Sequence, residues 1–174
     1  RFDEASVYLE RALQLRTDDK GSEDENTVST LHNLASLNRS RGQFVLAEQQ
    51  LSRVLEIKNR TLEPNDNRTL VSMELYGMVL SDLQRHAEAE RWLRLANERW
   101  TAIYGADSAN VAIGRHRLGQ VLANAGRIDD AKVELKHALN VESLAENAPT
   151  LRSALIRTQL ARLHESAGSL AAAE

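Results

Sequence analysis

Apolar residues recur along the chain at the spacing of amphipathic helices. Val28, Leu31, Leu34, Ala35 and Leu37 recur at helical spacing, and Arg41-Gly42-Gln43 ends this stretch. The same pattern along the whole chain predicts helices over residues 1–16, 26–41, 43–60, 67–83, 85–103, 109–125, 127–144 and 150–167, with a further helix beginning near residue 169. The pattern therefore indicates an all-α protein.

The pattern repeats with a period of 42 residues, which is the separation of Ala5 and Ala47. Each unit is a pair of helices, here named helix A and helix B, and equivalent positions in successive units form a column. Small residues let helix backbones approach closely, whereas large ones fill the space between successive pairs. A further column marks the turn before each helix B. These columns are Ala5, Ala47, Ala89, Ala131 and Ala173; Leu9, Leu51, Leu93 and Leu135; Leu34, Tyr76, Leu118 and Leu160; Ala35, Gly77, Gly119 and Ala161; and, at the turn, Gly42, Gln84, Gly126 and Gly168.

These columns resemble those of the tetratricopeptide repeat (TPR). The usual repeat has about 34 residues, and the longer unit, its linker Glu63-Pro64-Asn65-Asp66 and the motif Leu31-His32-Asn33-Leu34-Ala35 are similar to the kinesin-light-chain-like type. The resemblance implies a right-handed α-α superhelix, or solenoid, of helix-turn-helix repeats. The chain departs from the pattern at four positions, which are Gln84, His86, Arg115 and Arg157.

The period also sets the expected domain organisation. We expect a single solenoid over residues 1–174, composed of a partial repeat 1–24, repeats 25–66, 67–108 and 109–149, and a partial repeat 150–174. Natural arrays cap their ends with polar faces, and neither end of this chain shows such a face. The sequence therefore predicts a fragment of a longer array, with self-association through the exposed end repeats.

Composition narrows the function. The formal net charge of −3 argues against a nucleic-acid partner, because neutralising phosphates requires a basic excess. The chain has no Cys, and no apolar run approaches the length of about 20 residues that spans a membrane. We therefore expect a protein without a membrane partner. The lack of Cys leaves the redox compartment open, and we expect a location in the cytoplasm.

The chain carries no motif typical of an enzyme. It has no Gly-rich phosphate loop, nucleophile elbow or paired-carboxylate signature, so we expect no catalytic residues and no cofactor. His32, Glu74 and His116 fall in one column, but equivalent helices lie about 8–10 Å apart or more. Zinc ligands must converge within about 2.0–2.2 Å of one metal, so no metal site is expected either.

The surface formed by stacking is the remaining candidate site. The resemblance implies that helix A lines a concave groove, and that an Asn column binds a peptide backbone; here this column holds Asn33, Leu75, Arg117 and Gln159. Apolar groove residues beside guanidinium groups favour a hydrophobic peptide that also carries acidic residues. The groove candidates are His32, Asn33, Ser36, Val71, Glu74, Leu75, Met78, His116, Arg117, Gln120, Gln159 and Arg162.

Trp92 and Trp100 form a second candidate contact, on the outer, convex face. They lie eight residues apart on one helix B, in columns that otherwise hold mostly surface types. Burial of Trp100 under the linker near Tyr104 is the competing interpretation. The sequence predicts a non-catalytic scaffold that binds a protein or peptide in the groove. The alternative is the regulatory or sensory TPR region of a larger bacterial signalling enzyme, such as a protein kinase or a transcription regulator.

Overall fold

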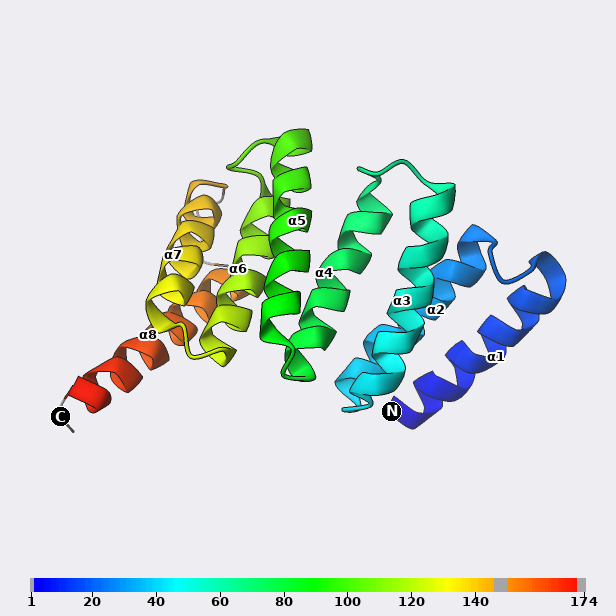
Figure 1. Ribbon diagram of the computed structural model, residues 1–174, viewed down its shortest axis with the longest axis horizontal. Coiled ribbons are helices and arrows are strands. Elements are labelled where there is room, and N and C mark those ends of the chain that lie inside the picture. The colour runs from blue at the N-terminus through cyan, green and yellow to red at the C-terminus, as the bar shows by residue number, and fades with distance from the viewer. Residues whose placement is uncertain (1, 146–149, 172–174) are drawn as a thin grey trace. The chain divides into compact units, whose positions relative to one another are not determined.

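Helices account for nearly all of the residues that the computed structural model describes, 2–145 and 150–171. Within these residues there are eight helices and no strand (Figure 1). No helix among them is long and apolar enough to cross a membrane. The predicted all-α class is confirmed. The helices are α1 (Phe2–Lys20), α2 (Glu25–Ser40), α3 (Phe44–Thr61), α4 (Asn67–Asp82), α5 (His86–Tyr104), α6 (Ala109–Asn124), α7 (Ile128–Ala145) and α8 (Leu151–Ala171).

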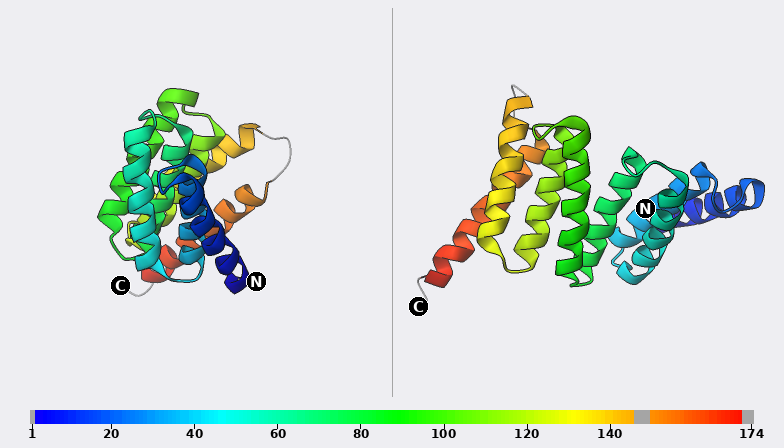
Figure 2. Two further views of the ribbon diagram at one scale, coloured as in Figure 1. Left: turned by 90° about the vertical axis from the view of Figure 1, so that its right-hand side faces the viewer. Right: turned by 45° about the horizontal axis from the view of Figure 1, so that its top comes forward.

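The chain divides into two compact units, residues 1–85 and 86–174. In the first unit α1 packs against α2, α2 against α3, and α3 against α4, and α2 also contacts α4. In the second unit α5 packs against α6, α6 against α7, and α7 against α8, as the views in Figure 2 show. The single solenoid over all 174 residues stays a prediction.

Two predicted helix boundaries are wrong. The first helix was expected to end at residue 16, but α1 continues to Lys20, where Gly21 with φ 89° ends it. The Gln14 side chain donates a hydrogen bond to the Asp18 carboxylate, one turn further along the helix, and this bond supports the extra turn. At the other end of the chain, the turn expected at Gly168 and the helix expected near residue 169 are absent, because α8 continues to Ala171. One Gly costs a helix only about 1 kcal/mol, and the flanking Ala residues favour helix.

The predicted packing columns form the core. Ala47, Ala89 and Ala131 are fully buried, and so are the Leu residues one turn further along each helix B. Gly119 shows why a small residue is needed in the facing column, since an added Cβ would lie 2.8 Å from Leu135 Cγ. The small-residue column therefore sets how closely α6 approaches α7.

The turn column is confirmed at the three positions where the structure gives its backbone angle. Gly42 and Gly126 have φ values of 76° and 77°, and Gln84 has a φ of 63°. This left-handed conformation is easy for Gly but strained for Gln, because the Cβ clashes with the backbone. The turn geometry of the repeat is therefore kept where the sequence departs from Gly.

Candidate functional site

A cavity of about 270 Å³ lies among α2, α3 and α4 in the first unit, and we call it the α2–α4 pocket. It brings together three predicted groove residues, His32, Asn33 and Val71. Asn33 is exposed and Val71 is 42% exposed, so both are available to a ligand. The other lining residues are Ser29, Lys58, Asn67 and Arg68.

Two helix N-termini hold this pocket in place. Asp24 caps α2, and Asp66 caps α4 by accepting a hydrogen bond from the Arg68 backbone N–H at 2.8 Å. The Arg68 side chain also pairs with Asp66, with Nη2 and Oδ2 2.8 Å apart, and it reaches across to Glu25 at the start of α2. Its hydrogen bonds lower the pKa of Asp66 to about 2. The first turns of α2 and α4 are thus joined by one guanidinium.

Lys58 is one of the pocket residues that were not among the predicted groove residues, together with Asn67 and Arg68. It lies near the end of α3 in a column taken as surface, yet it is only 7% exposed. Its ammonium donates to Arg68 O at 2.8 Å and to Ser72 Oγ at 2.9 Å. Ser72 Oγ lies 3.0 Å from His32 Nδ1, so a polar chain connects helix B of one repeat with helix A of two repeats. Burial lowers the pKa of Lys58 to about 8.

Lys58 also borders a second cavity, of about 220 Å³. Ser29 and Arg68 line both cavities, whereas Glu23 and Glu25 line only the second. The Lys58 amine therefore lies between two cavities. The second cavity has carboxylates in its wall, whereas the residues that line the α2–α4 pocket include no carboxylate.

In the second unit, the structure brings together three other predicted groove residues. His116 Nε2 lies 2.8 Å from Gln159 Oε1 and 3.4 Å from Gln120 Nε2. Burial lowers the pKa of His116, which favours the neutral ring. Arg117 is half-buried, whereas Arg162 is exposed. These side chains lie on α6 and α8, the A helices of this unit.

Four other predicted groove residues do not line the α2–α4 pocket. Glu74 is 3% exposed, so its carboxylate does not line an accessible groove. Leu75 is half-buried and packs against the core cluster around Ala35, Ala47 and Leu51. Ser36 and Met78 are half-buried.

The proposed outer contact at the two Trp residues is wrong for Trp100. This side chain is 3% exposed, and its ring lies 5.7 Å from that of Tyr104, as the competing interpretation expected. Trp92 is half-buried. No three His, Asp or Glu side chains among the described residues are placed to hold a metal ion.

Comparison with known proteins identifies the family. The tetratricopeptide repeat family model matches residues 1–60 and 68–142. The chain belongs to the tetratricopeptide repeat family. This confirms the predicted resemblance, and the TPR fold is typical of protein–protein interaction scaffolds, which are generally non-catalytic. A search of the curated proteins finds no significant match.

Solved structures share this TPR fold. BtubC (BKLC) from P. vanneervenii has a TM-score of 0.80 and 20% identity, over 96% of this chain and 66% of that chain. A Podosopora anserina kinesin light chain with nearly identical TPR-like repeats has a TM-score of 0.77 and 18% identity, over 97% and 80%. A Rap protein complexed with Competence and Sporulation Factor has a TM-score of 0.73 and 16% identity, over 99% and 48%. At these identities the likeness is one of fold, and this chain spans less than two thirds of BtubC and about half of the Rap protein.

Proposed function

We propose that this chain is a non-catalytic interaction scaffold that binds a peptide segment of a partner protein along its A helices, and that the segment carries an acidic residue beside an apolar one. The composition of the α2–α4 pocket supports this proposal. Its wall holds two cations, Lys58 and Arg68, beside the exposed Val71, and its lining residues include no carboxylate.

Lys58 supplies the chemical reason for an acidic partner. An ammonium has three N–H donors, and two of them bond to Arg68 O and Ser72 Oγ. Within the described residues no carboxylate lies within ion-pair distance of Lys58, although the side chain is almost completely buried. The carboxylates of Asp66 and Glu25 favour the charged amine through space, but burial outweighs them. A buried charge without a direct ion pair is costly. A carboxylate from the partner would accept the third N–H and neutralise this charge.

The remaining side chains suit the rest of such a segment. Val71 offers an apolar contact, and the exposed amide of Asn33 can both donate to and accept from a peptide backbone. In the second unit, Leu155 is 52% exposed and Arg162 is exposed on the same helix. We include Arg117 and Arg162 as further partners for acidic residues.

A peptide array followed by fluorescence anisotropy tests the proposal. We expect enrichment of peptides that carry Asp or Glu beside Leu, Phe or Trp, and loss of binding when the acid is changed to its amide. Val71→Asp should weaken binding by about tenfold or more, since it sets a carboxylate against the acidic peptide. Val133→Asp is the matched control, because Val133 is 65% exposed on a helix B.

The double variant Arg117→Glu with Arg162→Glu extends the test to the second unit. The double variant Arg91→Glu with Lys136→Glu, at exposed positions on α5 and α7, makes the same change in net charge and is the control. Binding that is unaffected by both Val71→Asp and the double variant would overturn the proposal.

The alternative function is a regulatory or sensory region of a larger bacterial signalling enzyme, such as a protein kinase or a transcription regulator. In fold, the chain resembles 48% of a Rap protein that was solved in complex with Competence and Sporulation Factor. The full-length gene tests this alternative directly. An encoded kinase or DNA-binding module would support it, whereas a gene that encodes only repeats would exclude it.

A further inference from the structure

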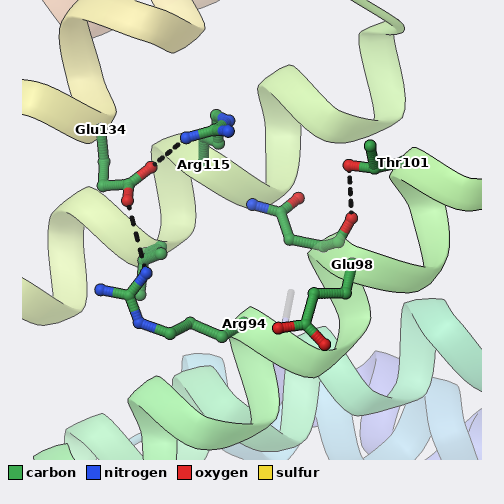
Figure 3. A pocket seen from close by; sticks show the side chains of 7 residues that line it. Arg94, Glu98, Thr101, Arg115 and Glu134 are labelled. Atoms are coloured by element: carbon green, nitrogen blue, oxygen red, sulfur yellow. Dashed lines mark hydrogen bonds and ion pairs between the residues drawn. The ribbon is translucent and has the colours of Figure 1, made fainter. Parts of the chain in front are cut away.

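A separate pocket of about 300 Å³ lies where α5, α6 and α7 meet in the second unit, and we call it the α5–α7 pocket. Figure 3 shows Arg94 and Glu98 of α5 together with Arg115 of α6 and Glu134 of α7 around it. Asn97 of α5 also lines it. None of these residues belongs to the predicted groove.

Polar residues stand here at positions that are mostly apolar in the other repeats. Asn97 and Arg115 occupy columns in which Leu55 (4% exposed) and Met73 (2% exposed) are core residues of the first unit. The substitution of both positions at one junction replaces apolar packing by a polar wall. The columns are Leu13, Leu55, Asn97 and Leu139, and Leu31, Met73, Arg115 and Arg157.

One buried carboxylate holds two guanidinium groups in this wall. Glu134 is 8% exposed, its Oε2 lies 2.8 Å from Arg115 Nη1, and its Oε1 lies 3.6 Å from Arg94 Nη1 (Figure 3). Arg94 is further fixed by Glu90 at 2.8 Å. The two planar donors are therefore held at the pocket by ion pairs.

Three polar groups of the pocket lack partners among the described residues. Asn97 is 9% exposed, and its Oδ1 accepts no hydrogen bond. Arg115 Nε is buried and donates none. No hydrogen bond or ion pair joins the carboxylate of Glu98, which is exposed, to another described residue. Buried polar atoms without a partner are costly, so a ligand that pairs with the buried atoms of Asn97 and Arg115 is favoured.

We propose that the α5–α7 pocket binds a small zwitterion of the free α-amino-acid class. The ammonium pairs with the exposed carboxylate of Glu98, which lines the pocket. The carboxylate accepts from Arg94 and Arg115, whose planar forks match its geometry. The volume lies at the lower limit for small-molecule sites, as expected for one amino acid.

Titration of the whole chain with the standard L-amino acids, followed by ¹⁵N NMR and calorimetry, tests this site. We expect at least one amino acid to bind and to move the Arg115 Nε–H signal, which Arg115→Met identifies by its loss. The N-acetyl derivative lacks the ammonium and the amide derivative lacks the carboxylate, so each should bind about tenfold more weakly or not at all. Failure of every amino acid to bind, or equal binding of both derivatives, would overturn the proposal.

Two variants separate this site from a purely structural polar cluster. Glu98→Gln changes an exposed carboxylate and should weaken binding by about tenfold, with unfolding unchanged. Glu56→Gln is the matched control, because Glu56 holds the same repeat position and lies outside the pocket. Peptide binding at the α2–α4 pocket should be the same in both variants. Equal amino-acid affinity of Glu98→Gln and Glu56→Gln would contradict the site.

Discussion

The Lys58 ammonium donates to Ser72 Oγ at 2.9 Å and so joins helix B of one repeat to helix A of the next. The same ammonium donates to Arg68 O, one turn earlier on α4. This pair of bonds holds the wall of the α2–α4 pocket, but it also places a cation in a position where water is almost excluded. Burial lowers the pKa of Lys58 to about 8, so the free energy of unfolding should depend on pH.

We expect Lys58 to make the protein more stable as the pH rises above 8. Below pH 8 the amine is charged in both states, and the folded state bears the full cost of burying it. Between pH 8 and about 10.5 the folded state releases the proton while the unfolded state keeps it, so the free energy of unfolding rises. Urea unfolding of the native chain and of Lys58→Met at pH 7 and pH 10 measures this. The native chain should gain on the order of 2–3 kcal/mol relative to the variant. An equal difference at both pH values would refute the prediction.

The period predicted the core because the contacts that it encodes are short and local. A column of Ala or Gly on one helix and Leu on the next has a single packing solution at close approach, as Gly119 and Leu135 show. The turn column could also be predicted, because the turn requires a positive φ and this backbone conformation favours Gly. Residue type alone was sufficient for these features.

The pocket could be predicted only in part, because residue type does not give the direction of a long side chain. Lys58 belongs to a column of mainly polar residues that was taken as surface. In the structure Arg16 of this column donates to Asn26 O at 3.1 Å, and Glu142 accepts from Arg152 at 2.6 Å. Each of these side chains reaches the start of the next helix A. Long polar side chains bury their stems while their ends find partners, so this column ties repeats together.

Replacing Gln84 by Gly, the residue that most repeats have at this turn, should stabilise the protein. Gly42 and Gly126 adopt nearly the same positive φ without strain, whereas Gln84 carries a Cβ. We expect Gln84→Gly to raise the free energy of unfolding by about 1 kcal/mol. Gln84→Ala removes the same polar side chain but keeps the Cβ, so it should give no gain. Equal effects of the two variants in denaturant unfolding would show that the backbone is not the cause.

Gly119→Ala should destabilise the second unit by about 1–3 kcal/mol, because the new methyl group would meet Leu135 Cγ at 2.8 Å. A double-mutant cycle with Leu135→Ala, measured by urea unfolding, checks the cause. The Ala at position 119 should cost much less when the Leu135 side chain has been removed. Additive effects of the two changes would mean that the contact does not limit the approach of α6 to α7.

Two helices carry exposed or half-buried residues at positions whose equivalents in other repeats are fully buried. Inside the array a helix A and a helix B pack through Ala35, Ala47 and Leu51, all of which are fully buried. On α8, a helix A, the residue equivalent to Ala35 is Ala161, and it is exposed. On α1, a helix B, the equivalents of Ala47 and Leu51 are only half-buried; these residues are Ala5 and Leu9.

We therefore expect two copies of this chain to associate head to tail, with α8 of one packed against α1 of the other. Such a contact is heterologous, so it leaves an uncovered face at each end and the oligomer grows with concentration. Light scattering after size-exclusion chromatography should give a mass that increases with concentration. Ala161→Glu places a charge on the contact and should give a monomer, whereas Ala154→Glu, also exposed on α8, should behave as the native chain. A constant monomer mass for the native chain, or the same loss of association in both variants, would show that these faces do not meet.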